Sequence, residues 1–175
     1  MLTQQARALG LQGRFDAGRA LLESLGQDAE PVDAAVRTRI RLEAGRLLNS
    51  AGNADEAVIE FEEAAALAGS DGLLFLQIDA LHMLAIADKA RSREWAAEAI
   101  DRALAAPDDR TRRWLVSLYN NLGCWYSEAG DLDQAMAAFA QAQQWADRVG
   151  TEQQRMWARE AVDECAEAQR ERAAR

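Results

Sequence analysis

The chain has little of what breaks helices or cross-links them. It contains two prolines, two cysteines and one histidine in 175 residues. Proline is the strongest helix breaker and alanine the best helix former, so this alanine-rich composition favours helix throughout. β-Branched residues never gather into the alternating runs typical of strands, so we expect no sheet. Hydrophobic residues make up 49% of the chain, which is enough for a continuous core.

Other absences disfavour whole classes of function. The net charge of −9 repels phosphate backbones, which argues against nucleic acids and anionic membranes as partners. No apolar run approaches the roughly 20 residues of a membrane span, and no signal peptide is visible. Cys124 and Cys165 have no metal-ligand spacing. We therefore expect reduced thiols, no metal or cofactor, and a cytoplasmic location.

What the chain does have is a repeat of 39 residues. Four segments align without gaps and start 39 residues apart, at positions 13, 52, 91 and 130; they read GRFDAG, GNADEA, RSREWA and GDLDQA. A fixed period of this size predicts stacked copies of one helical unit. The predicted organisation is four helix–turn–helix repeats and a capping helix, at residues 1–29, 30–69, 70–107, 108–149 and 150–175.

Turn and cap residues predict where the helices begin and end. Pro31 opens a helix that stops near Ser50, and Asn53 with Glu56 is read as a reciprocal cap of the next helix. The remaining helices are expected at about 53–69, 70–89, 93–106, 108–129, 131–149 and 151–172. Asp108 or Asp109, then Asp131, then Thr151 with Gln154 are the predicted caps of the last three.

The second helix of each repeat has one apolar face, with the same spacing of i, i+4 and i+7 in all four repeats. The face consists of a small residue, a larger apolar residue and a third small or apolar one: Gly18/Leu22/Leu25, Ala57/Phe61/Ala64, Ala96/Ile100/Ala103 and Ala135/Phe139/Ala142. One helix pair cannot bury such a face alone, so neighbouring pairs must stack on it.

The last repeat carries a family motif. A Tyr-x-x-Leu-Gly-x-x-Tyr pattern runs from Tyr119 to Tyr126, and the turn and apolar face described above follow it. The pattern resembles the tetratricopeptide repeat (TPR), with tyrosine in the usual tryptophan position. The second repeat is similar through Gly45, Gly52 and Phe61, whereas Leu84 and Arg91 replace both glycines in the third. The resemblance implies an all-α solenoid with a right-handed superhelix.

The period is longer than the usual TPR length of about 34 residues, and it resembles the extended repeats of peptide-sensing bacterial regulators and kinesin light chains. Before Gly13 there is room for only a short first helix. Two interpretations stay open: a naturally short capping repeat, or a piece of a longer array.

The resemblance also implies a concave groove lined by the first helix of each repeat. The candidate partner-binding residues in it are Arg39, Arg46, Asn49, His82, Asn120, Asn121, Cys124 and Ser127. The final helix would add Met156, Arg159, Glu160, Asp163 and Glu167. By these positions the amino-terminal part of the groove is basic and the carboxy-terminal part is acidic.

Each candidate has a structural alternative. Arg39 and Arg46 suit a ligand carboxylate, unless Glu43 and other acids neutralise them. Asparagine offers a donor and an acceptor to a peptide backbone, and the TPR resemblance implies this role for Asn121. The alternative is a hydrogen bond to a neighbouring helix.

His82 and Cys124 would permit nucleophilic chemistry if they faced the same groove within hydrogen-bond distance. A lone histidine more often packs than reacts, and no third orienting group is evident, so no catalytic residue is predicted. The five tryptophans are expected to seal contacts between repeats, although an exposed one could anchor a partner.

The sequence thus predicts a non-enzymatic protein-interaction module. It would bind a peptide or protein segment, one with an acidic or carboxylate group, in the concave groove. The alternatives are a structural or oligomerisation module that pairs with a second copy, and a regulatory TPR fragment of a larger bacterial-type transcriptional or signalling protein.

Overall fold

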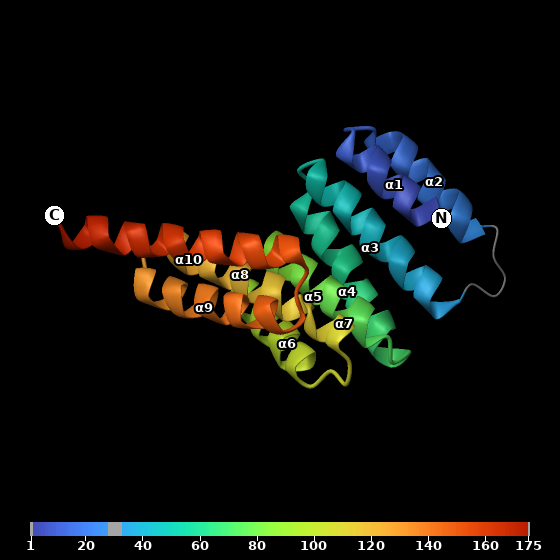
Figure 1. Ribbon diagram of the computed structural model, residues 1–175. Coiled ribbons are helices and arrows are strands. Elements are labelled where there is room, and N and C mark those ends of the chain that lie inside the picture. The colour runs from blue at the N-terminus through green and yellow to red at the C-terminus, as the bar shows by residue number, and fades with distance from the viewer. Residues whose placement is uncertain (1, 28–32, 175) are drawn as a thin grey trace. The chain divides into compact units, whose positions relative to one another are not determined.

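The computed structural model describes residues 2–27 and 33–174, which form helices and no strand (Figure 1). The helices are α1 (Leu2–Leu11), α2 (Phe15–Gln27), α3 (Ala34–Ser50), α4 (Ala54–Ser70), α5 (Leu74–Ala87), α6 (Ser92–Leu104), α7 (Asp109–Arg112), α8 (Trp114–Glu128), α9 (Leu132–Val149) and α10 (Glu152–Ala173). The predicted all-α repeat architecture is confirmed.

The chain divides into two compact units, Met1–Trp95 and Ala96–Arg175, and the division falls within α6. In the first unit α1 packs on α2, α3 on α4, and α4 on α5. In the second unit α8 packs on α9, and α10 covers both of them. Each unit therefore has its own stack of neighbouring helices.

The TPR-like motif residues form the same contact in both units. Gly45 on α3 lies against Phe61 on α4, and Gly123 on α8 lies against Phe139 on α9. A Cβ atom added to either glycine would come within 2.5 Å of a carbon of the facing ring. Phe61 is fully buried and Phe139 is 5% exposed. The glycine and phenylalanine positions are thus coupled, because the ring occupies the space that the missing side chain leaves.

The turns of the 39-residue period are of two kinds. Gly13, Gly52 and Gly130 have φ values of 73°, 89° and 77°, a left-handed conformation that favours glycine. At the remaining position, the third along the chain, the backbone of Arg91 has no positive φ. The third turn is therefore built differently.

Side chains hold this third turn. The Asp88 carboxylate accepts hydrogen bonds from the Arg91 backbone N–H at 3.2 Å and from the Trp95 indole N–H at 3.0 Å. The Ser92 hydroxyl donates to the Ala85 carbonyl at 2.6 Å. The Arg91 guanidinium lies 4.1 Å from the centre of the Trp95 ring. These contacts replace the glycine conformation of the other turns.

Three predicted caps are confirmed. The Asp108 and Asp131 side chains accept from the backbone N–H groups of Thr111 and Gln134. Thr151 and Gln154 form the complete capping box at the start of α10.

One helix boundary and one cap differ from prediction. The expected helix 108–129 is divided at Arg113, because the Val116 N–H bonds only three residues back and starts α8 anew. Asn53 makes no side-chain cap, and its backbone N–H already bonds to the Leu48 carbonyl, so the predicted reciprocal bond to Glu56 is wrong. Asp33 caps α3 at Ala34; the predicted opening at Pro31 lies outside the described residues.

Candidate functional site

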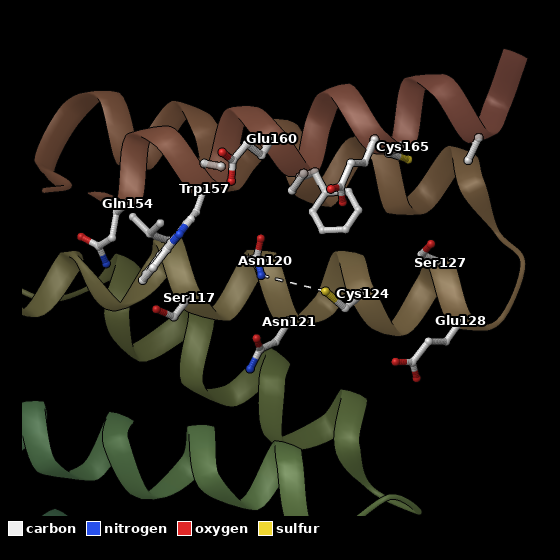
Figure 2. Close-up of a pocket in the computed structure, with 16 residues that line it drawn as sticks. Ser117, Asn120, Asn121, Cys124, Ser127, Glu128, Gln154, Trp157, Glu160 and Cys165 are labelled. Atoms are coloured by element: carbon white, nitrogen blue, oxygen red, sulfur yellow. Dashed lines mark hydrogen bonds between the residues drawn. The ribbon is translucent and has the colours of Figure 1, made fainter. Parts of the chain in front are cut away.

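A groove of about 670 Å³ runs between α8 and α10 in the second unit. Figure 2 shows that Asn120 and Glu160 face each other across it, while the ring of Trp157 reaches from α10 towards α8 beside Ser117. The groove floor is formed by apolar residues, among them Val116, Phe139 and Ala158.

The polar wall on α8 follows from helical spacing. Residues three and four apart share one face of a helix, and the groove-lining polar residues of α8 have this spacing. They are Ser117, Asn120, Asn121, Cys124, Ser127 and Glu128. The Asn120 amide lies 3.9 Å from the Cys124 sulfur, which is a weak contact. Four of the sequence-predicted residues thus line one groove: Asn120, Asn121, Cys124 and Ser127.

The opposite wall on α10 carries one large aromatic and two carboxylates. Trp157 is 58% exposed, which is unusual for so large an apolar side chain. Glu160 and Glu164 line the groove beside it. The sequence-predicted positions on this helix were out of register, because of the five residues only Glu160 lines the groove. Trp157 and Glu164 were missed there.

The groove is acidic. Glu128, Glu160 and Glu164 line it, and no lysine or arginine does so within the described part of the second unit. Burial raises the pKa of the Cys124 thiol, and the charges of Glu128 and Glu164 raise it further. A thiol in this setting is a poor source of thiolate at neutral pH.

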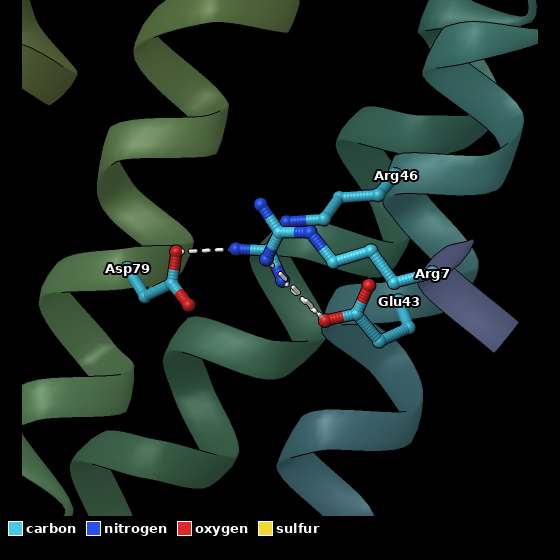
Figure 3. Close-up of polar contacts among 4 residues, drawn as sticks. All are labelled: Arg7, Glu43, Arg46 and Asp79. Atoms are coloured by element: carbon cyan, nitrogen blue, oxygen red, sulfur yellow. Dashed lines mark hydrogen bonds and ion pairs between the residues drawn. The ribbon is translucent and has the colours of Figure 1, made fainter. Parts of the chain in front are cut away.

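The first unit contains a partly buried ion-pair cluster, drawn in Figure 3. The Arg46 guanidinium donates to Glu43 on the same helix at 2.6 Å and to Asp79 on α5. Arg7 on α1 approaches Glu43 to 3.9 Å. Both carboxylates are buried, with 8% of each residue exposed. The cluster therefore joins α1, α3 and α5 through paired charges rather than apolar contact.

This cluster decides between the two interpretations of Arg46. Its side chain is only 13% exposed and is held by two carboxylates of the protein itself. Neutralisation, the structural alternative, is thus the observed arrangement, and Arg46 is not free to bind a ligand carboxylate as predicted. Asp79 was missed, although a single carboxylate in the apolar stretch of α5 signals a buried, partnered charge.

The other predicted residues of the first unit are scattered. Arg39 is exposed. Asn49 lines a small pocket of about 180 Å³ with Arg7 and Arg46. Burial lowers the pKa of His82, which keeps the imidazole neutral at pH 7. His82 and Cys124 belong to different units.

Residues 2–27 and 33–174 contain no group of three or more His, Cys, Asp or Glu side chains arranged to hold a metal ion. They also contain no helix with the length and apolar character needed to cross a membrane.

A family model of the tetratricopeptide repeat matches the helix pair on which the groove is built, at residues 116–148. Residues 116–148 are a tetratricopeptide repeat. The match covers α8 and most of α9, and thus includes the glycine and phenylalanine contact described above. It spans one repeat, so the extended 39-residue period stays a prediction.

Solved structures extend the likeness to the whole chain. The crystal structure of BtubC (BKLC) from P. vanneervenii aligns with a TM-score of 0.70 at 21% identity, covering 97% of this chain and 77% of that one. A putative kinesin light chain from Podosopora anserina, with nearly identical TPR-like repeats, aligns with a TM-score of 0.69 at 16% identity, covering 99% and 87%. No curated protein matches. The fold is therefore a TPR-like solenoid, and TPR repeats generally mediate protein–protein interaction.

Proposed function

We propose that this protein is a non-enzymatic interaction module that binds an extended segment of a partner protein in the groove between α8 and α10. The observation that carries the proposal is the groove itself, which places polar side chains of a TPR helix around an open apolar floor. Proteins bind ligands in concave, largely apolar sites with a few polar groups that set orientation.

The two asparagines supply the polar contacts of the proposed complex. An amide side chain can donate to a backbone carbonyl and accept from a backbone N–H, so it holds an extended chain of any sequence. Asn120 makes only the weak contact with Cys124, and Asn121 makes no side-chain hydrogen bond within the described residues. The alternative, in which they bond to a neighbouring helix, therefore has no support.

The length of α8 sets the length of segment that fits. A helix of 15 residues is about 22 Å long at ~1.5 Å per residue. An extended chain rises about 3.3 Å per residue, so six or seven residues would follow the helix from end to end. This is the size of a short linear segment in a partner protein.

Photo-crosslinking tests the proposal. A photoreactive amino acid at Ser117, inside the groove, should capture a partner segment from the native lysate. The same group at Gln144, exposed on α9 outside the groove, should not. Asn120→Ala with Asn121→Ala should abolish capture, whereas the exposed α9 pair Gln141→Ala with Gln144→Ala should not. Capture that survives the asparagine changes, or equal capture at both sites, would refute groove binding.

Self-association is a second candidate, favoured by the adjacent exposed side chains of Met156 and Trp157 on α10, which are 47% and 58% exposed. Light scattering distinguishes it from segment binding. A stable dimer that dissociates on Met156→Ala and Trp157→Ala would support it, and a monomer at all concentrations would exclude it.

A further inference from the structure

We infer that the segment bound between α8 and α10 is positively charged, with arginine side chains that pair with the groove glutamates. The inference rests on the proposed function and specifies its ligand. It reverses the sequence prediction of an acidic ligand, which depended on arginines such as Arg46.

The first argument is that the groove carboxylates have no partners. Glu128, Glu160 and Glu164 form no ion pair or hydrogen bond with another described residue, and no cation lines the groove with them. Three unpaired negative charges around one concave surface attract cations and repel acidic chains. A cationic segment would therefore gain attraction at every carboxylate it passes.

The second argument is that the arginines of α10 lie outside the groove. None of them lines it, and three bond elsewhere: Arg155 donates to the Gly150 carbonyl, Arg159 pairs with Asp147, and Arg172 donates to the Gly130 carbonyl. The glutamates at positions 160 and 164 are one helical turn apart and line the groove. The groove glutamates are therefore not neutralised by the arginines of their own helix.

The third argument is the exposed tryptophan at the end of the groove. Indole is the best aromatic partner for a cation, and guanidinium stacks on it more often than ammonium does. Trp157 lies one turn before Glu160 on α10 and lines the same groove. A ring and a carboxylate at this spacing would contact the plane and the N–H edge of one arginine side chain.

Arginine fits this arrangement better than lysine. Its planar guanidinium makes paired hydrogen bonds with a carboxylate and stacks on a ring, whereas an ammonium acts as a point charge. The Asn120 and Asn121 amides would meanwhile hold the backbone of the segment. The groove thus offers a distinct contact to each part of an arginine-bearing chain.

Fluorescence anisotropy with defined peptides tests the inference. The probe is an eight-residue peptide of alternating arginine and serine, compared with peptides in which glutamine or glutamate replaces arginine. Glu160→Gln with Glu164→Gln should weaken binding of the arginine peptide on the order of tenfold. The matched control is Asp163→Asn with Glu167→Gln, which removes the same charge from exposed positions of α10 outside the groove. The control should change the affinity less than twofold.

Each other outcome overturns the inference. Equal weakening by the control pair would mean that net charge alone attracts the peptide. Equal or tighter binding of the glutamine or glutamate peptide would mean that the groove does not select cations. In that case the proposed function still stands if the Asn120→Ala and Asn121→Ala protein loses crosslinking to its partner segment. If that variant keeps both peptide binding and crosslinking, the proposed function itself is refuted.

Discussion

Replacing Gly123 with alanine is the sharpest test of how the TPR motif determines packing. The added Cβ would lie 2.5 Å from two carbons of the Phe139 ring and 2.9 Å from a third. Carbon atoms in contact prefer a separation of about 3.5–4.0 Å, so the ring or the helix must move by about 1 Å. Phe139 is buried against Ala135 and Cys165, which leaves it little room to do so.

The expected magnitude follows from two opposing effects. Overpacking a filled core costs about 1–3 kcal/mol. Exchanging glycine for alanine within a helix returns up to about 1 kcal/mol. We therefore expect Gly123→Ala to lower the free energy of unfolding by about 1–2 kcal/mol, as measured by urea denaturation followed by far-UV circular dichroism.

Gly26→Ala is the matched control, because the same substitution in α2 meets open space. It should be neutral or stabilise by up to about 1 kcal/mol. Combining Gly123→Ala with Phe139→Leu should cost less than the sum of the two single changes, since the smaller side chain frees the contested space. A stabilising Gly123→Ala, or strictly additive effects, would refute the proposed coupling between the glycine and the ring.

Further predictions concern the cap and the buried charges. Thr151→Ala should lower the free energy of unfolding by about 1 kcal/mol by removing the α10 capping box, while Thr151→Ser should not. Asp79→Asn should cost about 2–4 kcal/mol in the same assay, because Arg46 would keep a partly buried charge with one carboxylate fewer. Burial raises the pKa of Glu43 above its ordinary 4.5, so the folded state binds the carboxyl proton more tightly than the unfolded state does. The free energy of unfolding should therefore fall as the pH rises from 4.5 through the raised pKa. Glu43→Gln should remove this decline. The His82 imidazole should titrate with a pKa below 6.5 in an NMR titration, whose signal is easily assigned because the chain has one histidine. A pKa at or above 6.5 would contradict the burial of His82.

The architecture was predictable because the repeated residues are those that pack the helices against one another and form the turns. The glycine at 123 and the phenylalanine at 139 are constrained by each other, and the turn glycines are constrained by their own φ values, so both leave a periodic signal. The caps at Asp131 and Thr151 were equally predictable from the sequence, because a helix cap depends only on residues within one turn.

The site was less predictable because its features depend on distant residues. For Arg46 the sequence left two interpretations open, a free cation or one neutralised by Glu43 and other acids, since its second partner Asp79 lies 33 residues away on another helix. The groove face of α10 was placed out of register, because the capping helix has no repeat turn from which to count. The candidates on α8 share one groove because the motif itself sets the register of that helix.

The turn from Asp88 to Trp95 has a consequence for how such arrays can be rearranged. Gly52 has no atoms of other residues near the place of a Cβ, and Asn53 beside it makes no side-chain cap, so that turn depends on backbone shape. A 39-residue unit could be inserted or removed there without losing a side-chain hydrogen bond of the turn, whereas the Gly130 turn would lose the bond from Arg172 to its carbonyl. A splice at Arg91 would separate Asp88 from the indole that it binds. Recombination, in evolution or in the laboratory, should therefore accept new modules at 52 more readily than at 91.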